Sequence, residues 1–91
     1  MTHAIVLVEA ERSAMATLGQ ELADIAGVGG VYSVTGEWDF VAVVHVKRHE
    51  DLRDVVTAGI GGLTGVARTQ TMVAFEVSSR HDLEAMFSIG E

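Results

Sequence analysis

Apolar residues along the chain fall into short segments with two different spacings. Residues 4–8 form a short, β-branched apolar run between polar neighbours, which predicts a strand. From Arg12 onward the apolar positions recur three or four residues apart, which is helical spacing, and Ser13 is a candidate N-cap. The apolar face of this predicted helix consists of Met15, Leu18, Leu22 and Ile25. The glycine-rich residues 27–30 are expected to end it.

The middle of the chain predicts a hairpin and a second helix. Residues 31–35 and 40–46 have strand-like composition, and the short turn Gly36-Glu37-Trp38 should make the two strands pair, because Gly tolerates the positive φ of tight hairpins. Glu50 and Asp51 then fall in the first turn of a helix, where acids complement the helix dipole. The apolar stripe of this helix consists of Leu52, Val55, Val56 and Ile60. A second glycine-rich stretch closes it.

A long strand over residues 66–77 and a short C-terminal helix complete the pattern. Ser79 and Asp82 resemble a capping box. The apolar face of the helix that follows consists of Leu83, Met86 and Phe87. The predicted order is β-α-β-β-α-β plus a terminal helix, an α+β, ferredoxin-like arrangement. Because no linker interrupts it, residues 1–91 are expected to form a single domain.

The strands carry more apolar residues than such a monomer needs. In this fold both helices cover one face of the sheet, so residues of the other face should be polar. Instead, three strands are apolar at both alternating positions: residues 5–8, 40–44 and 72–75. A second sheet is the simplest cover for the remaining face, which predicts a homodimer of the dimeric α+β barrel type. The composition, 48% hydrophobic, agrees with this expectation.

Charge and composition exclude several classes of function. The 13 acidic residues outnumber the 6 basic ones, giving a net charge of −7, which does not suit direct contact with nucleic acid. The chain has no Cys, so it has no disulfides and no thiol chemistry. The N-terminus does not resemble a signal peptide, and no apolar run reaches the roughly 20 residues that span a membrane. We therefore expect a cytoplasmic protein.

The hairpin turn offers the groups that an amino-acid ligand requires. Such a ligand carries an ammonium and a carboxylate close together. Backbone N–H groups near Gly36 are suited to the carboxylate, and the acids Glu37 and Asp39 are suited to the ammonium. Trp38 is a candidate for stacking on a ligand, for anchoring an interface or for plain packing. An ordinary hairpin with solvated acids is the alternative interpretation.

Two threonines at the start of the last strand are further candidates for ligand binding. Thr69 and Thr71 share one face, and their hydroxyls could donate hydrogen bonds to a carboxylate. The alternative is that Thr is simply a favourable strand residue.

Other site chemistries have little support in the sequence. The histidines are His3, His45, His49 and His81, and their spacing does not match the convergent ligands of a metal site. There is no Gly-x-Ser-x-Gly elbow and no phosphate-binding glycine loop. We expect no metal, no cofactor and no enzymatic activity.

Two segments resemble signatures of a known family. Residues 31–40, VYSVTGEWDF, are similar to the hairpin signature of the Lrp/AsnC ligand-binding domain, in which a Val is followed by Thr-Gly-x-x-Asp and an apolar strand. Residues 63–66, LTGV, together with Thr69 and Thr71, resemble the second signature, a Gly-Val entry to a strand with alternate threonines. The resemblance covers nearly the whole chain.

This resemblance implies a fold, an assembly and a ligand site. The family domain is ferredoxin-like and dimerises through its sheets, and the dimers often form octameric or similar rings. The effector, usually an amino acid, binds in clefts between subunits. By position, the residues that would line the cleft here are Gly36, Glu37, Trp38, Asp39, Thr69 and Thr71.

The sequence also departs from the family pattern. The family's helix-turn-helix is not expected, because the first strand begins almost at Met1. The usual Pro-Gly-Val turn is replaced by Ala26-Gly27-Val28. The expected role is therefore that of a transcription-regulatory sensor or co-regulator, with full-length Lrp/AsnC regulators as candidate partners.

Other functions remain open at this point. The same strand order occurs in small dimeric monooxygenases and isomerases, for which this chain offers His45, Tyr32 and His49. A purely structural partner of full-length regulators would need no ligand. ACT-like domains also share the strand order, but they usually associate edge to edge, which does not explain the two-sided apolar strands.

Overall fold

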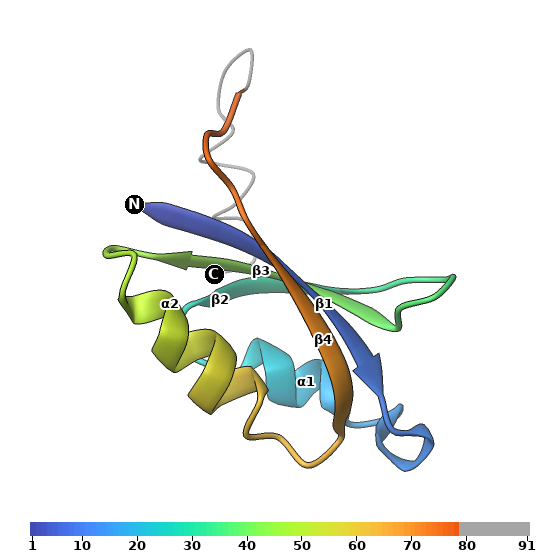
Figure 1. The fold of residues 1–91 in the computed structure, drawn as a ribbon. Coiled ribbons are helices and arrows are strands. Elements are labelled where there is room, and N and C mark those ends of the chain that lie inside the picture. Colours follow the sequence, from blue (N-terminus) through green and yellow to red (C-terminus); the bar gives the residue numbers. More distant parts are fainter. Residues whose placement is uncertain (79–91) are drawn as a thin grey trace.

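The structure, a computed structural model, describes residues 1–78 and contains a four-stranded antiparallel sheet with the order β2-β3-β1-β4 (Figure 1). The strands are β1 (Thr2–Ala10), β2 (Val28–Ser33), β3 (Phe40–Val46) and β4 (Val66–Val73). The helical segments are η1 (Arg12–Ala14), α1 (Leu18–Ala23), α2 (Asp51–Arg53) and η2 (Asp54–Ile60). The predicted α+β, ferredoxin-like order is confirmed. The predicted C-terminal helix lies outside the described residues.

The helices α1 and α2, the latter with its continuation η2, cover the same face of the sheet (Figure 1). Alternate residues of the two central strands point towards the helices, because successive strand residues face opposite sides. The buried set on this face is Ala4, Val6, Val8, Phe40, Ala42 and Val44, together with Leu18, Leu22, Leu52, Val55 and Ile60 from the helical segments. The predicted stripe of the second helix is confirmed, although its second half is a π-helix, as shown by the bond from Gly61 N–H to Val56 O of 2.9 Å.

The first helix is shorter than predicted. Residues 12–14 form a 3₁₀ turn and the α-helix starts only at Leu18, so Ser13 is not its N-cap. The Glu11 N–H donates to Gly65 O at 2.8 Å, which holds this stretch against the entry to β4 and forces a tight turn before the helix begins. Met15 is 46% exposed, so its predicted place on the apolar face is wrong.

Three predicted strand boundaries are also wrong. β2 begins at Val28 rather than Val31, because Gly27 alone, at φ 98°, reverses the chain after α1 and the next two glycines enter the sheet. β4 ends at Val73 rather than Val77. The connection between β2 and β3 comprises residues 34–39, longer than the predicted three-residue turn, and is closed by a bond of 3.0 Å from Val34 N–H to Asp39 O.

The face away from the helices is apolar at its centre, as the sequence predicts. Strand pairing places Tyr32, Val41, Leu7 and Gln70 in one row across the sheet, and Gly30, Val43, Ile5 and Met72 in the next. Ile5, Leu7, Val41 and Val43 are only half-buried, although they lie on the two central strands. We call this surface, residues 5, 7, 41 and 43, the open sheet face.

No helix within residues 1–78 is both long enough and apolar enough to cross a membrane.

Candidate functional site

The connection between β2 and β3, residues 34–39, contains four of the six predicted ligand-binding residues. Gly36 has φ 105°, and no heavy atom outside its immediate neighbours lies within 4 Å of where its Cβ would be. Its glycine is therefore required by the backbone conformation and not by crowding. Gly36 and Glu37 are exposed, whereas Trp38 and Asp39 are half-buried. We call residues 34–39 the hairpin loop.

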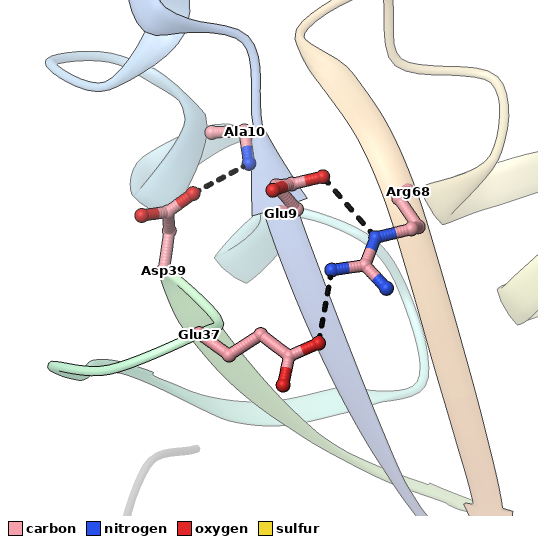
Figure 2. A network of polar contacts seen from close by, with 5 residues as sticks. All are labelled: Glu9, Ala10, Glu37, Asp39 and Arg68. Atoms are coloured by element: carbon pink, nitrogen blue, oxygen red, sulfur yellow. Dashed lines mark hydrogen bonds and ion pairs between the residues drawn. The ribbon is translucent and has the colours of Figure 1, made fainter.

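Asp39 is built into the framework of the hairpin loop. Its Oδ2 accepts a hydrogen bond from the Ala10 N–H at 2.8 Å (Figure 2). Its own N–H donates to Val8 O at 2.9 Å. The pairing of β1 with β4 shifts register between Glu9 and Ala10. At this irregularity the Ala10 N–H donates to the Asp39 carboxylate. Asp39 therefore fixes the hairpin loop to the end of β1.

Arg68 of β4 joins the hairpin loop to the sheet. Its Nε donates to Glu9 Oε1 and its Nη2 to Glu37 Oε2, both at 3.2 Å (Figure 2). Its Cζ lies 4.2 Å from the centre of the Trp38 ring, a cation–π distance. The hydrogen bonds to Glu9 and to Glu37 raise the pKa of Arg68 above its usual range.

Arg68 was not among the residues predicted from the sequence. It is the only Lys or Arg within the predicted last strand, and it directly precedes Thr69 in an acidic chain. That isolated positive charge was the available signal. Its partners could not be predicted, because Glu9 and Glu37 are distant in sequence.

The two predicted threonines lie on the other side of β4. Thr69 pairs with Val8 and Thr71 with Val6, which places both on the helix-covered side of the sheet, whereas Arg68 pairs with Glu9 on the opposite side. Both threonines are nevertheless exposed, because β4 is an edge strand. The structure thus brings Glu37 and Trp38 together with Arg68, but not with the threonines. A ligand that contacts both groups has to lie along the edge of β4.

Three of the four histidines, His3, His45 and His49, lie within the residues that the structure describes. His3 and His45 lie on neighbouring strands with ring centroids 6.1 Å apart, and their residues pair across the sheet. Across residues 1–78 no group of three or more His, Cys, Asp or Glu could hold a metal ion. His45 lies on the side of the open sheet face and not between sheet and helices, where an enzyme site of the monooxygenase or isomerase type would require it. His81 falls outside the described residues.

Comparisons with known proteins agree with this architecture. Residues 3–83 match a family model described as the Lrp/AsnC ligand binding domain. An uncharacterised HTH-type transcriptional regulator of Pyrococcus furiosus, PF0250, is 34% identical over 58 residues, which are 64% of this chain and 39% of that protein. The match therefore spans well under half of that relative's length.

Solved structures show the same fold. The protein TTHA0845 of Thermus thermophilus superposes with a TM-score of 0.83 and 45% identity, covering 88% of this chain and all of that one (100%). The feast or famine regulatory protein Rv3291c of M. tuberculosis, solved in complex with L-methionine, superposes with a TM-score of 0.68 at 24% identity. That similarity covers 89% of this chain and 56% of the regulator, and it supports the fold alone.

Proposed function

Because the chain belongs to the Lrp/AsnC family, through its ligand-binding domain over residues 3–83, we propose that it binds an amino-acid effector and forms oligomers as part of a transcription-regulatory system. The effector site comprises the hairpin loop and the edge of β4. Its residues are Gly36, Glu37, Trp38, Asp39, Thr69 and Thr71. Binding of the effector shifts the state of assembly or the affinity for a partner regulator.

The single observation that carries the proposal is the composition of the hairpin loop. The backbone at Gly36 is uncovered, and the Glu37 carboxylate stands at the surface beside the half-buried Trp38. Backbone N–H groups and a carboxylate are complementary to the two charged ends of an amino acid. The M. tuberculosis regulator, which has the same fold, is seen with L-methionine, and this supports the choice of ligand class.

The open sheet face supports the proposed assembly. Its four aliphatic side chains lie side by side on the central strands, and a second copy of the chain would remove them from water. A symmetric dimer buries the same patch on both copies, and a stable interface needs about 800 Å² per partner. Larger rings, and full-length Lrp/AsnC regulators with a matching sheet, are the further partners we propose.

An effector can change assembly only if it binds two states with different affinity. We propose that neighbouring subunits of a ring meet at the edge of β4, so that a site there meets this requirement. The ligand then contacts groups that are brought together in one assembly and separated in another.

Isothermal titration calorimetry of the wild-type protein against glycine and each of the standard L-amino acids tests the proposed ligand class. We expect saturable binding of at least one of them, and no binding of its D-enantiomer, which serves as the control. Absence of heat across the whole panel at millimolar ligand would contradict the proposal. Binding of both enantiomers alike would point to non-specific association.

A further inference from the structure

The ion pair between Arg68 and Glu37 lies at the surface and can be separated at low cost. Arg68 Nη2 and Glu37 Oε2 are 3.2 Å apart, and the two side chains are 49% and 69% exposed. Exposed ion pairs of this kind contribute little to stability. Separating the two groups therefore costs little, and it leaves two opposite charges available to a ligand.

Two contacts besides Glu37 hold the guanidinium of Arg68. Glu9, on the neighbouring strand, holds Nε at 3.2 Å, and the Trp38 ring lies 4.2 Å from Cζ. These contacts use one edge and one face of the planar group. Figure 2 shows that the two carboxylates bind different nitrogens, Glu9 on Nε and Glu37 on Nη2. Arg68 is therefore positioned in advance as a donor towards the hairpin loop.

We propose that an L-α-amino acid binds between these two side chains, with its carboxylate on Arg68 Nη2 and its ammonium on Glu37 Oε2. This inference rests on the proposed function and specifies the polar contacts of that site. Binding replaces one exposed ion pair with two charge-assisted hydrogen-bonded pairs. Arg68 thereby becomes a ligand-binding residue that determines specificity for the α-carboxylate.

The charges of the cluster select a zwitterion over other small ligands. Glu9 and Glu37 surround a single guanidinium, so a purely anionic ligand such as phosphate would be repelled by two carboxylates. A purely cationic ligand such as a polyamine would find the acids but would face the fixed charge of Arg68. A neutral zwitterion satisfies both signs, because its carboxylate can face Arg68 while its ammonium faces Glu37.

The test measures discrimination between derivatives of one ligand. The tightest-binding L-amino acid from the panel is titrated beside its N-acetyl derivative, which lacks the ammonium, and its amide, which lacks the carboxylate. We expect the wild-type protein to bind each derivative about tenfold more weakly, since each loses one charged hydrogen bond.

Variants then test which side chain binds the ammonium of the amino acid and which binds its carboxylate. Glu37→Gln should bring the affinities for the free and N-acetyl forms together while preserving discrimination against the amide. Arg68→Gln should do the reverse, and Arg68→Lys, which keeps the charge, should retain part of the discrimination against the amide. Arg48→Gln, which removes an exposed ion pair with Asp51 that does not involve the hairpin loop, is the matched control and should change neither ratio.

The outcomes separate this inference from the proposed function. A wild-type protein that binds no amino acid overturns both. A wild-type protein that binds an amino acid, with both ratios unchanged in Glu37→Gln and Arg68→Gln, overturns the inference and leaves the proposed function standing. The inference is supported if Glu37→Gln loses only the discrimination against the N-acetyl form and Arg68→Gln loses only the discrimination against the amide. The Arg68→Lys variant preserves the test if Arg68→Gln fails to fold.

Discussion

The carboxylate of Asp39 accepts a hydrogen bond from the backbone N–H of Ala10, 2.8 Å away. The two acids of the hairpin loop therefore have different positions in the structure. Asp39 is half-buried and bound to the end of β1. Glu37 is exposed, and its side chain forms an ion pair with Arg68. The acid that ties the loop to β1 through its Oδ2 thus stands two residues from an acid whose carboxylate is exposed at the surface.

Replacing Asp39 should lower stability. Asp39→Ala leaves the partly buried Ala10 N–H without its acceptor, which costs about 1–3 kcal/mol in the free energy of unfolding. Urea denaturation at a fixed protein concentration measures this change. Glu11→Ala, which removes an exposed carboxylate just beyond the same strand end, should change the free energy of unfolding by less than about 0.5 kcal/mol. Equal losses in the two variants would show that the Asp39 contact has no special role.

Gly27 should not tolerate a side chain. Its φ of 98° strains any L-residue, and a Cβ at this position would lie 2.7 Å from Val55 Cγ2 in the core. We expect Gly27→Ala to cost at least about 1–3 kcal/mol in the free energy of unfolding. Gly30→Ala is the control, because no heavy atom lies within 4 Å of its Cβ position and its φ is ordinary. The account of the α1–β2 connection fails if Gly27→Ala is as stable as Gly30→Ala.

The sequence predicted the order of the elements because periodicity depends only on local spacing. Short, β-branched apolar runs in residues 4–8 and 40–46 identified β1 and β3, and the stripe from Leu52 to Ile60 identified the second helix. Boundaries were less predictable because tertiary contacts determine them. The bond from Glu11 N–H to Gly65 O delays α1, and no local pattern contains that information.

The candidate site was only partly predictable for the same reason. Gly36, Glu37, Trp38 and Asp39 are consecutive, so a single motif identifies them. Arg68 comes close to these residues only because β1 pairs with β4. That pairing brings Glu9 and Arg68 together although they are 59 positions apart in the sequence. The assignment of Thr69 and Thr71 to a ligand cleft stays a prediction.

A charge on the open sheet face should prevent the proposed dimer from forming. Leu7→Glu places a carboxylate in the centre of the face, and burying that charge against a second sheet is unfavourable. Light scattering coupled to size exclusion should show a fall from the mass of the wild-type assembly to that of a monomer. Thr57→Glu, at an exposed position of η2, is the control and should leave the mass unchanged. An unaltered assembly in Leu7→Glu would mean that the copies associate through another surface.

The threonines of β4 should affect ligand affinity without affecting the fold. Thr69→Val and Thr71→Val keep the shape and the strand propensity of the side chain and remove only the hydroxyl. We expect amino-acid affinity to fall about fivefold for each hydroxyl that donates to the ligand. Calorimetry measures the affinity, and circular dichroism confirms the fold. Thr57→Val provides the comparison, and identical affinities in all variants would exclude these hydroxyls from the site.

The central claim is that an amino acid binds this chain and shifts its assembly. Light scattering coupled to size exclusion, with and without each L-amino acid, tests it most directly. The account predicts a dimer or larger ring whose mass changes with at least one amino acid. A monomer under all conditions would contradict the role of the open sheet face. An assembly whose mass is the same with and without every amino acid would contradict the claim that effector binding controls assembly.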